Sequence, residues 1–316
     1  MRILVVGAGV IGAIYGWALS AAGHDVTHLV RPGRASTLSD GLAMDVLDKR
    51  GGHARRFRGR YALRPTETIA GAPRFDLVIV PVKHYRLMET LEQVVPLLPG
   101  TEYVLLTQNW KGSSELESVI SPSHFLFGDA KAGGGFKEGT LVATIKGIDL
   151  GQVNSRRDEC LQRAIALFRS ASIRVTVQDD ILHYLWIQYA INGGLWPAVV
   201  RAGGVEAALG DGETADLGLR AVRECLEVVA RRGVDLDRYQ EAHVYLSTSF
   251  ITKHVAGMAL RWMFRHSEYV KRNSVHALSD PQEIKVFYDD LVGSGRELGV
   301  PMAAMSSFGE DIRTLA

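Results

Sequence analysis

The sequence predicts an α/β fold, in which a doubly wound, mainly parallel sheet over residues 1–178 is followed by an all-helical domain over residues 179–316. Three observations lead to this prediction. A chain of 316 residues holds about two domains of roughly 150 residues each. Apolar runs typical of buried strands alternate with helical stretches in the first part. Strand patterns become rare after residue 180, where helical patterns dominate.

The composition indicates a soluble globular protein. Hydrophobic residues make up 47% of the chain and charged residues 22%, which excludes disordered, collagen-like and polytopic membrane proteins. The 36 basic residues nearly balance the 35 acidic ones and form no basic block, so neither nucleic acid nor a membrane is an expected partner. Cys160 and Cys225 lack metal-ligand spacing and are too few for a disulfide framework. A cytoplasmic protein without a metal is therefore expected.

The first 30 residues predict one βαβ unit, with a strand at 2–6, a helix at 10–22 and a second strand at 25–30. The uncharged run from residue 3 to residue 23 also resembles a secretory signal. Its four glycines and the single preceding Arg2 argue against that alternative.

The remaining elements follow from hydrophobic periodicity and from helix-terminating residues. Strands are expected at 75–82, 102–107, 125–127 and 173–177, and helices at 85–98, 113–120 and 157–170. Residues 133–135 and 141–153 are less regular and indicate an antiparallel addition to the sheet. In the second domain, helices are expected at 180–200, 213–232, 237–268 and 281–298, with Gly233 and Gly299 as helix ends.

The sequence GAGVIG at residues 7–12 matches the G-x-G-x-x-G pattern between a strand and a helix. In such a turn Gly7 permits the tight bend, Gly9 lets the backbone approach a pyrophosphate, and Gly12 lets the helix pack on the sheet. Val10 and Ile11 lie at the helix N-terminus, whose free N–H groups favour an anion. The pattern predicts a Rossmann-type dinucleotide site; a glycine-rich turn without a ligand is the alternative.

The end of the second strand predicts which dinucleotide binds. NAD-binding folds usually place Asp or Glu there to hold the ribose 2′-OH, but this strand ends in Arg31. A guanidinium suits a 2′-phosphate, so NADPH is favoured over NADH. The alternative is that Arg31 and Arg34 are solvated loop charges.

Two further strands end in polar residues at the edge where ligands of open α/β sheets bind. Lys83 follows one strand and could pair with cofactor charge, and Asn109 follows the next and could contact both the nicotinamide and a substrate carbonyl. Ordinary polar termination of strands is the alternative for both residues.

Several features together carry a resemblance to a known family: the glycine turn at 7–12, Arg31, Lys83, and the pairs Gln108-Asn109, Leu185-Trp186 and Glu283-Ile284. With these features the chain resembles the ketopantoate reductase (2-dehydropantoate 2-reductase) family. The resemblance implies an N-terminal Rossmann domain, a helical C-terminal domain, an active site between them, and NADPH-dependent reduction of a 2-keto acid to a 2-hydroxy acid.

The resemblance also implies roles for residues of the second domain, although the match is uneven. Family members carry a Lys two residues after the Leu-Trp pair as general acid, and Asn four and eight residues further on; here these positions hold Gln188, Asn192 and Trp196. Glu283 lies sixteen residues before Gly299, as in the family. The catalytic positions are thus Gln188, Asn192 and Glu283. The substrate-binding positions are Asn109, Asn192, Trp196 and Ser274.

The residues themselves allow other roles. Gln188 and Asn192 share one face of a helix that is apolar nearly all round, so their amides either bond within the core or point into a polar cleft. Asp280 and Glu283 are placed to form a capping box. Gln188 can donate a hydrogen bond but cannot transfer a proton, so the candidate proton donors are Glu283 through water, Tyr189 and His276.

Gln188, Trp196 and Trp110 all depart from the family pattern toward less charge and more apolar area. The departures favour a reductase whose substrate is larger or aromatic, or an imine that is already protonated. Two alternatives stay open: a genuine 2-dehydropantoate 2-reductase with a relocated acid, and a non-catalytic NADPH-binding sensor. The expected partner is a small keto or imino substrate, and the apolar helical domain allows a homodimer.

Overall fold

The computed structural model describes residues 1–153, 158–246, 267–273 and 280–315. The chain divides into two compact units, Met1–Leu182 and His183–Ala316, whereas the sequence placed the boundary at residue 178. Among the described residues, no helix is both long enough and apolar enough to cross a membrane.

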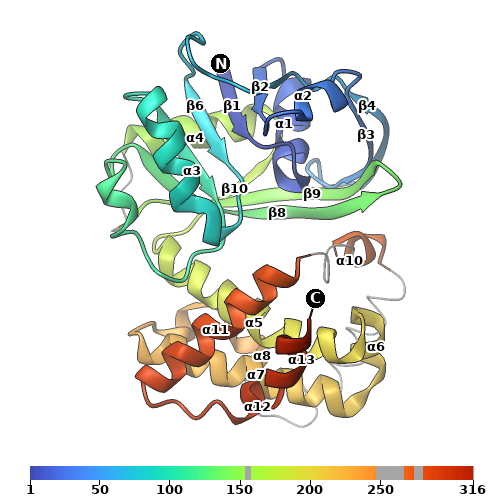
Figure 1. Cartoon of the computed structure of the whole chain (residues 1–316), viewed down its shortest axis with the longest axis vertical. Helices are drawn as coiled ribbons and strands as arrows, with labels where there is room; N and C mark the ends of the chain where they lie inside the picture. The colour runs from blue at the N-terminus through green and yellow to red at the C-terminus, as the bar shows by residue number, and fades with distance from the viewer. Residues whose placement is uncertain (154–157, 247–266, 274–279, 316) are drawn as a thin grey trace. The chain divides into compact units, whose positions relative to one another are not determined.

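The first unit is built on one ten-stranded sheet (Figure 1). Its strands are β1 (Arg2–Val6), β2 (Asp25–Leu29), β3 (Leu42–Asp48), β4 (Arg55–Tyr61), β5 (Pro65–Thr66), β6 (Leu77–Val80), β7 (Glu102–Leu106), β8 (Phe125–Lys137), β9 (Thr140–Gly151) and β10 (Arg174–Val177). They follow the order β4-β3-β9-β8-β7-β6-β1-β2-β5, with β10 paired to β9. The sheet and the helical second unit confirm the predicted fold class.

The strand order reverses at β1. The chain passes from β1 to β2 on one side and later returns to β6 on the other, and both pairings are parallel. β6 pairs with β7 and β7 with β8, also in parallel. The carboxyl ends of β2, β1, β6 and β7 therefore meet at one edge, around the point where the strand order reverses. Ligands of open α/β sheets bind at such a point.

Both faces of the central strands are buried, as a doubly wound sheet requires. Ile3 and Val5 of β1 belong to a core cluster that includes α1 (Val10–Ala21) and α4 (Glu159–Ser170). Leu4 lies between them, points to the opposite face, and is also fully buried. The rings of Tyr15 and Phe168 meet edge to face, so α1 and α4 cover the same face. The unit also contains α2 (Arg34–Thr37), α3 (Leu87–Val94) and 3₁₀ turns at His84–Arg86, Val95–Leu97 and Leu116–Ser118.

The β8–β9 hairpin confirms the predicted antiparallel addition (Figure 1). Residues 133–135 do not interrupt β8, which continues to Lys137. Gly134 explains why this stretch looks irregular in the sequence. Its φ is +154°, and a Cβ there would overlap the carbonyl oxygen of Val142 on β9. A glycine is therefore required inside this strand.

One expectation for the first unit was wrong, and one pair of strands was missed. The helix at 113–120 is only a 3₁₀ turn over Leu116–Ser118. The antiparallel pair β3–β4 was not predicted, because β4 carries four arginines and exposes most of its residues at the edge of the sheet. Asp45 on β3 supports this edge by accepting two hydrogen bonds from Arg56, at 2.6 and 2.8 Å.

The described part of the second unit is helical. Its helices are α5 (Ile181–Ala202), α6 (Val205–Gly210), α7 (Gly212–Arg231), α8 (Gln240–Leu246), α10 (Glu268–Asn273), α11 (Pro281–Glu297), α12 (Ala303–Ser307) and α13 (Gly309–Thr314), with a 3₁₀ turn at Leu236–Arg238. The first two residues of α5 belong to the first unit. Gly233 and Gly299 have φ of +92° and +68° just after α7 and α11, which confirms both predicted helix ends. Of the predicted helix at 237–268, α8 ends at Leu246, and residues 247–266 lie outside the described residues.

Two glycines let other helices approach α5 closely. A Cβ on Gly194 would lie 2.6 Å from Cα of Val222 on α7, and one on Gly193 would overlap the side chain of Leu291 on α11. The Val222 contact is with backbone, so α7 packs directly against the backbone of α5 at Gly194, and the Leu291 side chain of α11 fills the space beside Gly193. This packing sets where the polar residues of α5 and α11 lie within the second unit.

Candidate cofactor site and active-site residues

The turn after β1 has the backbone conformation that the glycine pattern predicts. Gly7 has φ of +97°, which favours glycine, and its N–H donates to the carbonyl of Leu29 on β2 at 2.7 Å. A Cβ on Gly12 would lie 3.0 Å from the Gly7 carbonyl oxygen and 3.1 Å from Cγ of Pro81. Gly12 therefore lets α1 pack against both the turn and the end of β6.

The start of α1 is shaped for a ligand. Gly9 is the residue that precedes the helix, and its position offers no side-chain cap. A Cβ built on Gly9 would meet none of the described atoms within 4 Å. The first-turn N–H groups of Val10 and Ile11 have no acceptor within the helix, and the helix dipole favours negative charge there. Open space beside these donors fits a pyrophosphate.

Arg31 and Arg34 lie just beyond β2, and both are exposed. β2 pairs with β1 up to the register Val6 with Leu29, so Arg31 follows the strand end next to the glycine turn. Glu67 lies in the same region and was not predicted as a site residue. It follows β5, and its Oε1 accepts a hydrogen bond from the N–H of Ala35 at 2.9 Å. This carboxylate is thus engaged with the backbone at the start of α2.

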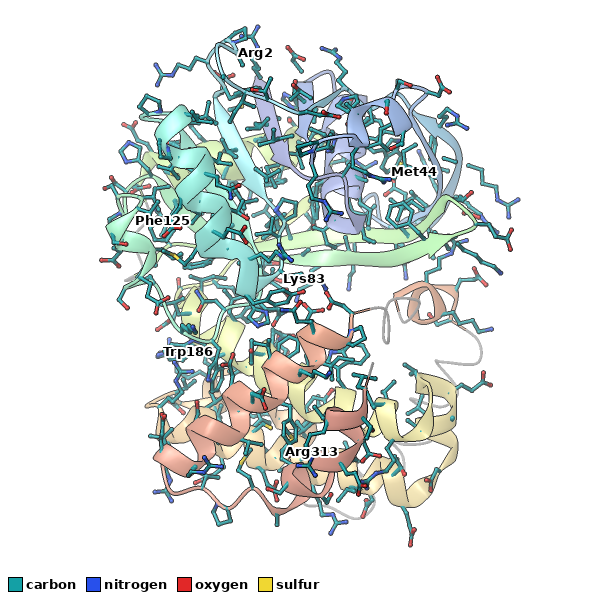
Figure 2. The ribbon with its side chains drawn as sticks, in the orientation of Figure 1. Arg2, Met44, Lys83, Phe125, Trp186 and Arg313 are labelled. Carbon is teal, nitrogen blue, oxygen red and sulfur yellow. The ribbon has the colours of Figure 1, made fainter. Side chains whose placement is uncertain are left out.

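Lys83 lies beyond the carboxyl end of β6 (Figure 2), and its side chain is exposed. Arg2, at the start of β1, lies at the opposite edge of the sheet in the same view. The order β7-β6-β1-β2 places Lys83 between the glycine turn and the residues that follow β7. Its ammonium group therefore stands at the edge where the sequence placed it.

Asn109 follows β7 and is only 6% exposed. Its Nδ2 donates to the carbonyl of Gly112 at 2.8 Å, and its Oδ1 accepts from the N–H of Gly112 at 2.7 Å. The amide thus organises its own loop, a role that the sequence reasoning did not give it. One N–H and one lone pair remain for a ligand.

Gln108 is a second residue that the sequence reasoning left without a role. Its Oε1 is buried and accepts no hydrogen bond within the described part of the chain. An unsatisfied buried acceptor costs about 1 to 3 kcal/mol. Because Gln108 also follows β7, this oxygen is suited to a hydrogen-bond donor on a ligand at the same sheet edge.

His28 lies behind the glycine turn and was also missed. It is fully buried on β2, with Nδ1 2.9 Å from the carbonyl oxygen of Gly7 and Nε2 3.1 Å from the hydroxyl of Tyr61. Burial lowers the pKa of His28 to about 4, so the ring is neutral at pH 7. The one available sign in the sequence was that His28 shares the buried face of β2 with Val26.

In the second unit, Gln188, Asn192 and Trp196 lie on successive turns of α5. All three are half-buried rather than fully buried. No hydrogen bond joins the Gln188 or Asn192 amide to another described residue, and both amides keep their capacity to bind a ligand. Trp196 packs beside Val199, Val205 and Ala208 in a small apolar cluster of this unit.

Glu283 occupies the third position of α11. Its N–H donates to Oδ1 of Asp280 at 3.1 Å, which confirms the Asp280 half of the predicted capping box. The Glu283 side chain is half-buried, and its charge acts on Tyr189 of α5. Ser274 and His276, the other residues implied for the second domain, lie outside the described residues.

Tyr189 is fully buried, and its hydroxyl donates to Oδ2 of Asp290 at 2.6 Å. Burial and the Asp290 carboxylate raise the pKa of Tyr189. The phenolic proton is therefore held by Asp290, and Tyr189 is a poor proton donor. Trp110, one of the departures from the family pattern, is buried, with 6% of its surface exposed.

Comparison with known proteins agrees with this geometry. The family model Ketopantoate reductase PanE/ApbA matches residues 3–153. A 2-dehydropantoate 2-reductase from Pyrococcus abyssi is 22% identical over 242 residues, which cover 75% of this chain and 76% of that protein. The structure of 2-dehydropantoate 2-reductase from Geobacter metallireducens superimposes with a TM-score of 0.75 at 19% identity, covering all of both chains. The chain thus resembles ketopantoate reductases, by the family model over residues 3–153 and by its relatives over most of its length.

Another structural neighbour of this chain is a complex of D-mandelate dehydrogenase with NADH. Its TM-score is 0.73 at 16% identity, and the match covers 99% of this chain and 98% of that one. At such identities the likeness shows the shared fold alone. The relatives named here are oxidoreductases, and the ketopantoate reductase family is an oxidoreductase family.

Proposed function

We propose that the protein is an NADPH-dependent reductase that transfers a hydride to a 2-keto acid, or a related carbonyl or imine, other than ketopantoate. The observation that carries the proposal is the glycine turn at the reversal of strand order, with Arg31 following the adjacent strand. The choice of cofactor and the proposed chemistry at the substrate are supported by different residues.

A dinucleotide fits along the edge formed by the ends of β2, β1, β6 and β7. With about 4.8 Å between neighbouring strands, this edge spans roughly 14 Å. Arg31 stands at one end, the glycine turn lies at the centre, and Lys83 and Gln108 stand toward the other end. The buried Gln108 oxygen suits the amide N–H of a nicotinamide carboxamide.

The charges beyond β2 favour NADPH over NADH. Arg31 and Arg34 are exposed there, and a guanidinium binds phosphate through charge-assisted hydrogen bonds. Glu67 is the carboxylate that could serve a ribose 2′-OH instead, but it bonds to the Ala35 N–H. We therefore assign the 2′-phosphate to the arginines.

The reaction consumes one hydride and one proton for each carbonyl that becomes a hydroxyl. When bound, NADPH supplies the hydride. Gln188 donates a hydrogen bond toward the negative charge that develops on the substrate oxygen, as an oxyanion-hole residue does. Since an amide cannot give up a proton near neutral pH, the proton comes through water held by Glu283. A protonated imine would need no such donor.

The experiment that tests the reaction is NADPH oxidation with ketopantoate, a panel of bulkier 2-keto acids, and keto acid plus amine mixtures. We expect turnover with a bulkier or imino substrate and little with ketopantoate. Gln188→Lys restores an ammonium at the family position and should raise ketopantoate turnover. Gln162→Lys, on the exposed face of α4, is the matched control and should change nothing.

Each other outcome has a distinct meaning. Rapid ketopantoate turnover by the parent protein identifies a genuine 2-dehydropantoate 2-reductase with a relocated acid. NADPH binding without oxidation of any panel member identifies a cofactor sensor. Either outcome overturns the proposed reaction. We also propose that the protein is cytoplasmic, in keeping with two buried free thiols, Cys160 and Cys225.

A further inference from the structure

We propose that His28 is a positioning residue for the cofactor. It holds the Gly7 carbonyl toward β2 and thereby aims the next N–H, that of Ala8, at the pyrophosphate. The inference rests on the proposed function, because it assigns this role toward a dinucleotide bound at the glycine turn. His28 does not touch the cofactor itself.

Gly7 makes two hydrogen bonds that hold the turn against β2, one to Leu29 and one to His28. The Gly7 N–H donates to the Leu29 carbonyl at 2.7 Å, and the Gly7 carbonyl accepts from Nδ1 of His28 at 2.9 Å. The first bond fixes where the chain leaves β1. The second fixes the orientation of the peptide plane that follows Gly7.

Peptide geometry links this second bond to the ligand side. In a trans peptide the carbonyl of one residue and the N–H of the next point in opposite directions. With the Gly7 carbonyl directed at His28, the Ala8 N–H points away from β2. Gly7 is a glycine at φ of +97°, so its own conformational preferences constrain this plane weakly. His28 supplies the constraint.

The tautomer of His28 follows from its two partners. A carbonyl oxygen only accepts hydrogen bonds, so Nδ1 carries the proton that is donated to Gly7. In the neutral ring Nε2 is then an acceptor, and the Tyr61 hydroxyl, 3.1 Å away, donates to it. The two rings lie edge to face with centroids 5.8 Å apart. Tyr61 thus selects the tautomer that can hold the turn.

Gly16 accommodates this arrangement, although the dinucleotide pattern does not require a glycine there. A Cβ on Gly16 of α1 would overlap Nε2 of His28 and would lie 3.1 Å from the Tyr61 hydroxyl. The glycine therefore leaves the volume that the imidazole ring occupies. The cluster behind the turn therefore consists of His28 on β2, Tyr61 on β4 and Gly16 on α1.

Two isosteric substitutions of His28, by Asn and by Gln, distinguish the contribution of Nδ1 from that of Nε2. Asn in place of His28 retains an amide N–H near the position of Nδ1, whereas Gln reaches toward Nε2 and loses the bond to Gly7. Phe retains the ring without either bond. We expect His28→Gln and His28→Phe to weaken NADPH binding by about tenfold, the effect of losing one buried hydrogen bond. His28→Asn should stay within about threefold of the parent protein, well inside the cost of that bond.

The measurement is the Kd of NADPH by fluorescence titration, together with KM and kcat on the turnover substrate and thermal unfolding without cofactor. A positioning role raises Kd and KM for NADPH and leaves kcat at saturating NADPH nearly unchanged. A merely structural role would lower thermal stability in all three variants alike, with no rescue by Asn. That pattern would overturn the inference.

Gly16→Ala provides an independent check of the geometry. It should weaken NADPH binding in the parent protein, because the new Cβ displaces the imidazole. In the His28→Asn background, which lacks Nε2 and Cε1, the same substitution should be tolerated. Equal losses in both backgrounds contradict the proposal.

Failure of the inference and failure of the proposed function are distinguishable. If the parent protein binds neither NADPH nor NADH, the proposed function fails and the inference fails with it. If the parent binds NADPH and His28→Phe binds it equally well, the inference alone is overturned.

Discussion

At the level of a single side chain, Arg31 is the residue that we propose to distinguish NADPH from NADH. Arg31→Ala removes a guanidinium at the end of β2, and we expect the affinity for NADPH to fall about tenfold or more while the affinity for NADH stays unchanged. Calorimetric titration with both cofactors measures the difference.

Arg74→Ala is the matched control for Arg31. Arg74 is exposed too, but it precedes β6 and so lies at the amino-terminal edge of the sheet. If Arg31→Ala lowers the affinities for NADPH and NADH equally, Arg31 does not bind the 2′-phosphate.

His28 also couples stability to pH. Its pKa is lowered to about 4 by burial, against the ordinary value of 6.5 in the unfolded chain. Below pH 6.5 the His28 ring binds a proton in the unfolded state, whereas in the folded state it stays neutral down to about pH 4. The free energy of unfolding therefore decreases as the pH falls through this window, by about 3 kcal/mol in all.

Urea unfolding at pH 7, 5 and 4 tests this coupling. The parent protein should lose more stability than His28→Asn over the same range, because the variant has no imidazole to protonate. Parallel pH profiles for the two proteins would show that His28 is not responsible.

Among the elements, the close approach of α7 to α5 depends on Gly194. A Cβ there would lie 2.6 Å from the Val222 backbone, so Gly194→Ala must push the two helices apart. We expect a loss of about 1 to 3 kcal/mol in the free energy of unfolding, as for other overpacked cores.

Gly293→Ala is the control for that prediction. Gly293 lies inside α11, and a Cβ there would meet nothing within 4 Å among the described residues. Since Ala suits a helix interior better than Gly, this variant should gain about 0.5 to 1 kcal/mol. Two equal losses by chemical denaturation would refute the packing assignment of Gly194.

The elements differ in how well sequence predicts them, and the reasons are physical. The first βαβ unit was predictable because the glycine pattern, a buried strand and a helix coincide within 30 residues. β4 was not, because its arginines face solvent and an edge strand needs no continuous apolar run. The middle of β8 was not predicted as a strand because glycine is unusual there, and the backbone at Gly134 requires one.

At the scale of the whole molecule, the sheet edge with the glycine turn could be predicted, and the contacts between helices of the second unit could not. Parallel strands bring their carboxyl ends together by topology, so Gly7, Lys83 and Asn109 were expected at one edge. Tyr189 and Asp290 meet across 101 residues through helix packing that periodicity does not specify. His28 was missed because its role depends on Tyr61 of a strand that was itself not predicted.

Transfer of deuterium from NADPH labelled at C4 of the nicotinamide tests the central claim most directly. The two C4-labelled diastereomers are incubated separately with the protein and the substrate found in the panel, and the product is analysed by mass spectrometry. We predict that one diastereomer delivers deuterium to C2 of the hydroxy acid, or to the former imine carbon, with one NADPH oxidised per product. NADPH oxidation without deuterium in the product, or no oxidation with any substrate, would contradict the account.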